Sequence, residues 1–162
     1  MTRWLDDDEQ RTWRSFLATS ELLYGALDRQ LQRDAGINHA SYVVLAMLSE
    51  APGRSLRMSE LAALANSSPS RLSHAVARLQ ERGWIRREPT PKDGRGTVAV
   101  LTDAGWDKVT ATAPGHVAEV RRLVLDPLTR TQLRQLHEIA TRIRQVLRPD
   151  GTLPTLDPLD AS

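Results

Sequence analysis

The sequence predicts a mainly α-helical fold with one small β-hairpin. Apolar residues recur at three- and four-residue steps over most of the chain, whereas one stretch, residues 84–101, is partly alternating and rich in β-branched residues. Glycine or proline separates several of these segments. The chain has 162 residues, the length of one domain with a buried core, and it shows no internal repeat.

The first expected helix spans about residues 7–34. The acidic run from Asp6 to Glu9 suits its start, because carboxylates oppose the positive end of the helix dipole. Its apolar residues follow helical spacing: Trp13, Phe16, Leu17, Leu23, Tyr24, Leu27 and Leu31. So long a helix carries more apolar surface than one small domain covers, so we expect a second subunit to cover it.

Two shorter helices should follow. Gly36 ends the first helix, and Asn38 can cap the next one, which runs to Glu50. The third helix is expected from Ser59 to Ala65 with weak capping, because no Ser, Thr or Asp precedes it.

The fourth helix combines a buried stripe with a basic polar face. Ser68 is a good N-cap and Pro69 suits the first helical position. One face carries Leu72, Ala75, Val76 and Leu79, and the other carries Ser70, Arg71, Ser73, His74, Ala77 and Arg78. Arg71 lies at the positive end of the helix dipole, which indicates that an external anion compensates it.

A hairpin and two further helices complete the expected order. The strands are Trp84 to Glu88 and Thr97 to Leu101, with Arg95 exposed between two glycines at the tip. Thr102 caps a helix that bends at Pro114-Gly115 and continues to Leu125, and a Thr129/Gln132 capping box starts a last helix ending near Leu147. We expect residues 149–162 to form a disordered tail.

The charge is unevenly distributed. The net charge is only +2, but residues 54–96 carry nine basic and four acidic side chains, whereas the remainder carries 13 basic and 16 acidic ones. A basic middle on a near-neutral scaffold is typical of a polyanion-binding module, although a chance arginine-rich surface would look the same.

This order of elements is that of a winged helix-turn-helix flanked by further helices on its N- and C-terminal sides. A helix fits the major groove of B-DNA, and an adjacent hairpin can place an arginine in the minor groove or against phosphates. The candidate DNA-binding residues are Ser68, Ser70, Arg71, Ser73, His74, Arg78, Arg86, Arg87, Lys92 and Arg95. Asp93 is expected to orient Arg95 rather than to contact DNA. For each of them a solvated surface, or for Ser68 a simple cap, is the alternative.

Several motifs carry a family resemblance. Glu60-Leu61-Ala62, Ser70-Arg71-Leu72-Ser73, residues 79–87 (LQERGWIRR), Asp93-Gly94-Arg95 and residues 101–105 (LTDAG) are similar to the pattern of the MarR (multiple antibiotic resistance regulator) family of bacterial transcriptional regulators. The resemblance covers about residues 7–147, and the hairpin with the following LTxxG is its most specific part.

The resemblance implies an obligate homodimer, joined through the first and last helices, on a pseudo-palindromic double-stranded DNA operator. It divides the chain into a dimerisation helix (1–36), a winged helix-turn-helix (37–101), further dimerisation helices (102–148) and the tail. It also implies that a small lipophilic or phenolic anion binds between the dimerisation helices and the DNA-binding lobe. The effector-binding candidates are Trp13, His39 and Tyr42, for which core packing is the alternative.

Other classes of function lack support in the sequence. There is no cysteine, so disulfides, thiol catalysis and thiol redox sensing are excluded. The four histidines have no metal-ligand spacing, and no phosphate-binding or nucleophile motif occurs, so we expect no enzyme activity, metal or cofactor. The start of the chain does not resemble a signal peptide and no apolar run could span a bilayer, so a cytoplasmic location is expected.

Three functions remain to be distinguished. A ligand-responsive repressor is the leading hypothesis. A winged-helix protein–protein interaction module and a constitutive architectural DNA-binding protein are the alternatives.

Overall fold

The computed structural model describes residues 1–90 and 96–147 and confirms a mainly helical fold with a small antiparallel sheet. The predictions for Lys92, Asp93, Arg95 and the tail lie outside these residues. The helices are α1 (Asp7–Ala35), α2 (His39–Glu50), α3 (Met58–Leu64), α4 (Pro69–Glu81), α5 (Asp103–Val120) and α6 (Arg130–Leu147). Two short turns, η1 (Pro52–Arg54, 3-10) and η2 (Arg121–Leu125, π-helical), complete the helical segments. The strands are β1 (Ser55–Arg57), β2 (Ile85–Pro89) and β3 (Thr97–Leu101).

Local capping explains where the first helices begin. Asp6 Oδ1 accepts hydrogen bonds from the backbone N–H groups of Asp8 and Glu9, both at 2.9 Å, while Glu9 Oε2 accepts one from the Asp6 N–H at 3.0 Å. Gly36 ends α1 with a φ of 65°, a backbone conformation that favours glycine. Asn38 then caps α2 by accepting from the Ser41 N–H at 2.8 Å.

The region before α3 differs from the expectation in one respect. The sheet has a third strand, β1, and its order is β1-β3-β2, with Ser55 opposite Val100 and Ile85 opposite Leu101. Three residues are too few to show an alternating pattern, so this strand depends on the free edge of β3. As expected, Arg57 offers no side-chain cap to α3, and its N–H instead donates to Glu60 Oε2 at 3.2 Å.

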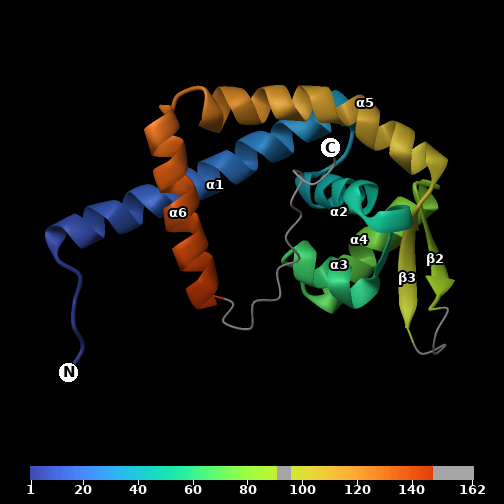
Figure 1. Cartoon of the computed structure of the whole chain (residues 1–162), viewed down its shortest axis with the longest axis horizontal. Coiled ribbons are helices and arrows are strands. Elements are labelled where there is room, and N and C mark those ends of the chain that lie inside the picture. The colour runs from blue at the N-terminus through green and yellow to red at the C-terminus, as the bar shows by residue number, and fades with distance from the viewer. Residues whose placement is uncertain (91–95, 148–162) are drawn as a thin grey trace.

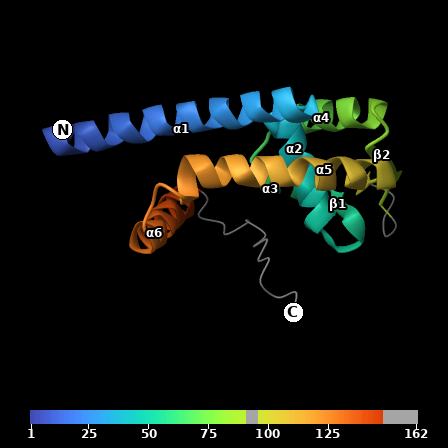
Figure 2. The ribbon, with the colours of Figure 1, turned by 90° about the horizontal axis from the view of Figure 1, so that it is seen from above.

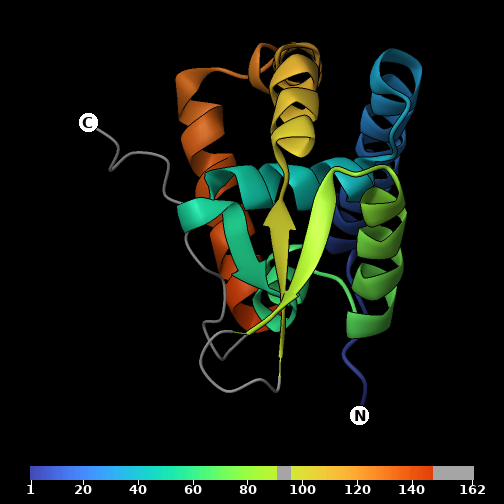
Figure 3. The same ribbon diagram turned by 90° about the vertical axis from the view of Figure 1, so that its right-hand side faces the viewer.

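One hydrophobic core holds the lobe formed by α2, α3, α4 and the sheet. The predicted stripe of α4 is buried and packs against residues of α2, α3 and β2, among them Leu45, Leu61 and Ile85. Figure 3 shows the sheet beside these helices, with the β3 arrow running toward the start of α5. The core therefore fixes α4 and the base of the hairpin as one unit.

The long helices extend beyond this lobe, although Leu31 of α1 and Val109 of α5 join its core. α1 and α5 pack side by side, and the N-terminal part of α1 projects well beyond the lobe (Figures 1 and 2). α6 turns away from the line of α5, and none of its residues is buried (Figure 1). Among the described residues, no helix combines the length and the apolarity needed to cross a membrane.

Candidate nucleic-acid interface

The polar face of α4 is an exposed basic surface of the lobe. Ser70, Arg71, His74 and Arg78 are exposed, and within the described ranges the side chains of Arg71, His74 and Arg78 have no hydrogen bond or ion pair to another residue. Ser68 caps the helix, because its Oγ accepts from the Arg71 N–H at 3.3 Å. The face thus presents donors at a helix N-terminus with no acidic neighbour on α4 before Glu81.

Two predicted contact residues on β2 have internal partners. Arg87 Nη2 donates to the backbone oxygen of Ser73 at 2.8 Å and to its Oγ at 3.3 Å, which ties the hairpin to α4. Arg86 pairs with Glu88 on the exposed side of the strand. Arg87 and Ser73 therefore brace the two elements against each other, and their contact with DNA stays a prediction.

A cleft of about 620 Å³ lies beside the basic face of α4. Arg71, His74 and Arg78 line one side of it, and Tyr24 and His39 line the other. Its remaining lining is mostly apolar and includes Val43, Val44, Leu72 and Ala75. An apolar floor with cationic groups at the rim suits a small aromatic anion.

The predicted effector residues separate into two places. His39 lies between Tyr24, with ring centroids 5.0 Å apart, and His116, at 6.1 Å, while the Tyr42 ring lies tilted against His116 at 4.5 Å. Trp13 lies about three turns earlier on α1 than Tyr24, roughly 16 Å along the helix, and stacks on Phe16. The structure brings His39 and Tyr42 together around His116 but leaves Trp13 apart.

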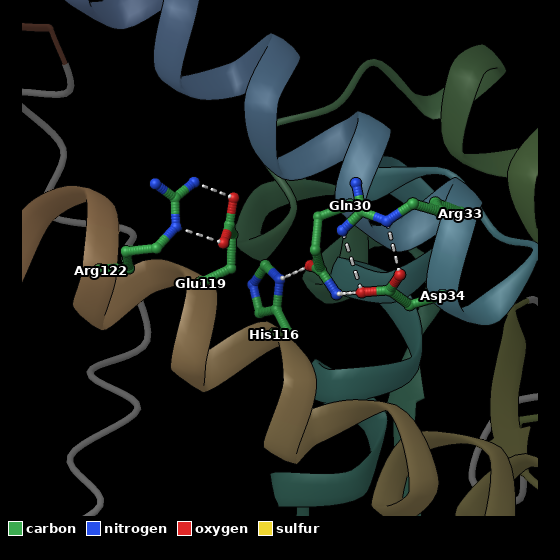
Figure 4. Close-up of polar contacts among 6 residues, drawn as sticks. All are labelled: Gln30, Arg33, Asp34, His116, Glu119 and Arg122. Atoms are coloured by element: carbon green, nitrogen blue, oxygen red, sulfur yellow. Dashed lines mark hydrogen bonds and ion pairs between the residues drawn. The ribbon is translucent and has the colours of Figure 1, made fainter.

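A polar network joins α1 to α5 next to these rings (Figure 4). Gln30 is buried, its Nε2 donates to Asp34 Oδ2 at 3.1 Å, and its Oε1 lies 3.2 Å from His116 Nδ1. Because the Gln30 oxygen can only accept, His116 Nδ1 carries the hydrogen. Arg33 pairs with Asp34 at 2.8 Å, and Arg122 with Glu119 at 2.7 Å.

This network and the nearby burial shift several pKa values. The hydrogen bonds from Gln30 and then Arg33 lower the pKa of the Asp34 carboxyl. Burial lowers the pKa of His39, against the opposing effect of the Asp28 carboxylate. Burial and the positive charge of a protonated His39 lower the pKa of His116. Both pKa values therefore lie further below pH 7 than that of an ordinary histidine.

We expect the protein to lose stability on mild acidification. The pKa values of His39 and His116 are lower in the folded chain than the ordinary value of 6.5, so the unfolded chain binds more protons just below that pH. The contribution of the two neutral histidines to the free energy of unfolding is fully present above about pH 6.5. It is lost as the pH falls toward their pKa values in the folded chain. Thermal unfolding at pH 7.5 and pH 5.5 measures this loss.

The control for this pH dependence is His116→Gln, which keeps a polar side chain that can bond to Gln30 but removes one titrating group. It should show a smaller fall in midpoint temperature between the two pH values than the wild type. An equal fall in both proteins would mean that other groups cause the pH dependence.

Sequence reasoning missed Gln30 and His116. Neither belongs to a motif, and they meet only because α1 and α5 pack together across 86 positions of the chain. The described residues contain no group of three or more metal-ligating side chains placed to hold an ion.

The fold and the basic helix define a winged helix-turn-helix protein of the kind that regulates transcription. A model of the MarR family matches residues 35–96. The crystal structure of Sco3205, a MarR family transcriptional regulator from Streptomyces coelicolor in complex with DNA, is 51% identical, with a TM-score of 0.90, and the match covers 92% of this chain and 93% of that one. AbsC, a MarR family regulator from the same organism, is 40% identical, with a TM-score of 0.88 and coverage of 91% and 99%.

The transcriptional repressor MprA of Escherichia coli K12 is 27% identical over 108 residues, which is 67% of this chain and 61% of that one. The chain thus spans less than two thirds of the length of this curated relative. On the similarity to Sco3205 and AbsC over nearly their whole lengths, the chain belongs to the MarR family of transcriptional regulators.

Proposed function

We propose that the protein is a homodimeric repressor that binds a pseudo-palindromic operator with α4 in the major groove. The observation that carries this proposal is the exposed face of α4, where Arg71, His74 and Arg78 have no partner among the described residues. The related regulator Sco3205 was crystallised with DNA, and MprA is a repressor, which supports both parts of the proposal. Ser70 and the capped start of α4 would face phosphates or base edges beside these residues.

Fluorescence anisotropy tests the proposal. The protein is titrated into labelled DNA from upstream of its own gene and, in parallel, into a scrambled duplex of the same composition. Both titrations use the same salt concentration. Specific binding is expected with a Kd of about 10⁻⁸–10⁻¹¹ M and at least roughly 10³-fold tighter than to the scrambled duplex. Equal affinity for the two duplexes would contradict sequence-specific regulation.

The dimer would form through α1, α5 and α6, and residues 37–101 would form the DNA-binding unit. α6 is strongly amphipathic but has no buried residue in one chain. Large apolar side chains are exposed on all three helices: Trp13, Phe16, Leu17, Val117, Leu136, Ile139, Ile143 and Val146. Since monomers rarely expose so much apolar helix surface, a second copy of the chain is its expected cover.

Ile139→Asp is expected to weaken this dimer by about 100-fold or more. Ile139 is 54% exposed in one chain, and a two-fold interface would bury it twice, at roughly 1.5–3 kcal/mol for each side chain. Sedimentation velocity over a concentration series measures the change. Gln145→Asp, which is exposed on the side of α6 opposite the apolar stripe, is the matched control and should remain dimeric. Wild-type dimerisation in Ile139→Asp would place the interface elsewhere.

The same proposal includes control by a small aromatic anion in the cleft beside α4. Its carboxylate or phenolate would pair with Arg71 or Arg78, while Val43 and Leu72 contact its ring. Because the same guanidinium groups would face DNA, the anion and DNA would exclude each other. Benzoate should displace bound DNA, uncharged benzyl alcohol should not, and Arg78→Gln should weaken the benzoate effect. Equal effects of the two compounds would argue against a charge-recognising site.

A further inference from the structure

Trp84 lies where three parts of the fold meet: the end of α1, the link from α4 to β2, and the first turns of α5. Its ring is flanked by two cations, since the Arg82 guanidinium carbon is 5.1 Å and Lys108 Nζ 5.2 Å from the ring centroid. We call the contacts among Arg82, Trp84, Lys108 and the end of α1 the tryptophan joint.

Both cations also bind the end of α1. Lys108 Nζ donates to the Ala35 oxygen at 2.6 Å, and Arg82 Nη1 donates to the Gly36 oxygen at 3.2 Å. The last carbonyls of a helix lack intrahelical partners and carry partial negative charge, so cations stabilise them. The C-terminus of α1 is thereby connected to α5 by one side chain and to the lobe by the other.

The backbone of Trp84 is fixed independently of its ring. Its N–H donates to the Leu79 oxygen at 3.0 Å, and its oxygen accepts from the Thr102 N–H at 3.0 Å. Thr102 Oγ1 also donates to the Gly83 oxygen at 2.7 Å. The ring therefore projects from a rigid base shared by α4, the hairpin and α5.

Apolar packing does not fill the space on the α1 side of this base. A cleft of about 380 Å³ lies there, lined by Gly36, Asn38, Arg82 and Trp84 among others. The Arg82 side chain crosses this gap to reach α1. Leu31 and Ile37 pack into the core beside this cleft, and the polar contacts of the joint add a second connection between the end of α1 and the end of α4.

From this geometry we infer that the tryptophan joint sets the angle between α1 and the DNA-binding lobe. In a dimer built on α1, that angle determines the separation of the two α4 helices and thus the half-site spacing that the protein accepts, about 34 Å for one helical turn. Arg82 and Lys108 are positioning residues in this account. The consequence for DNA spacing rests on the proposed function, whereas the angle itself does not.

The angle can be measured without DNA by spin labelling. Because the chain has no cysteine, a label attaches only to cysteines that are introduced. Spin labels on Ser15→Cys in α1 and Gln80→Cys in α4, both exposed, report the intrachain distance by double electron–electron resonance. The full-length labelled protein is diluted with excess unlabelled protein so that only distances within one chain contribute.

Lys108→Met and Arg82→Met should each shift and broaden the distance distribution, because methionine keeps an apolar contact with Trp84 but cannot bind the α1 carbonyls. Lys108→Arg should restore the wild-type distribution. Arg54→Met is the matched control, since the Arg54 guanidinium lies 4.0 Å from the centroid of the Trp106 ring and, within the described residues, pairs with Asp103 rather than with α1. Thermal unfolding verifies that each variant is folded.

An unchanged distribution in folded Lys108→Met and Arg82→Met would overturn the inference, as would an equal shift in Arg54→Met. The DNA readout is the preference between operators whose half-sites differ by one base pair in spacing, which should fall by about tenfold in Lys108→Met. If the wild type binds no specific DNA, the proposed function fails, but the distance measurement still decides whether the joint sets the angle.

Discussion

Arg71→Glu is expected to lower the affinity for specific DNA by at least about 100-fold. A bidentate contact from arginine to guanine contributes roughly 1–3 kcal/mol, and a carboxylate in its place adds repulsion from the phosphates. Arg71 is exposed on α4 and its side chain has no partner within the described ranges, so the substitution removes no internal ion pair. Anisotropy with the specific duplex at fixed salt measures the loss.

Arg130→Glu is the matched control for Arg71→Glu. It changes the net charge equally, and an acidic side chain in the first turn of α6 suits the helix dipole. It should bind DNA within a few-fold of the wild type. Adding Arg95→Glu to Arg71→Glu should abolish binding while the dimer persists in sedimentation. Full DNA affinity in the double variant would favour the protein–protein interaction module.

Gly105→Ala should destabilise the fold by about 3 kcal/mol, at the upper end of what overpacking costs. Gly105 is buried in the first turn of α5, and a Cβ there would lie 2.1 Å from the Trp84 oxygen and 2.7 Å from Leu101 Cδ1. The first contact is with backbone, which the Thr102 bonds hold in place, so a side-chain rotation cannot relieve it. Urea unfolding measures the change.

At Gly115, on the same helix, a glycine-to-alanine substitution should raise the free energy of unfolding instead of lowering it. A Cβ at Gly115 would meet only Gln30 Nε2 at 3.7 Å, an ordinary contact. Because alanine is better than glycine in a helix interior, Gly115→Ala should stabilise by roughly 0.5–1 kcal/mol. Similar losses at both positions would mean that the approach of α5 to Trp84 is not tight.

The sequence predicted the elements whose signals are local. The acidic run at the start of the first helix, the Asn38 cap, Pro69 after Ser68, and the stripe of Leu72, Ala75, Val76 and Leu79 each depend on residues within two turns, and the structure has the corresponding helices and buried face. β1 was missed because three residues carry no period and pair only with a distant strand.

The features that connect distant parts of the chain could not be predicted. The sequence predicts Arg87 as a DNA-binding residue but gives no sign of its contact with Ser73, which depends on how the hairpin packs on α4. Lys108 reaches Ala35 across 73 positions, and His116 reaches Gln30 across 86. Such pairings follow from tertiary packing and leave no pattern in composition or spacing.

The architectural alternative makes a different prediction for salt. For a protein that binds through phosphates alone, the logarithm of the affinity should fall steeply with the logarithm of the salt concentration, with a slope of about 0.9 per phosphate contacted. Such a protein should show little preference between sequences. A specific regulator retains a large ratio between operator and scrambled DNA at the same salt concentration.

Hydroxyl-radical footprinting of the wild type on its upstream DNA tests the central claim most directly. A symmetric dimer with one α4 in each of two major grooves should protect two patches related by two-fold symmetry, with centres about 34 Å or one helical turn apart. A single unsymmetrical patch, or uniform protection at every concentration that binds DNA, would contradict the account.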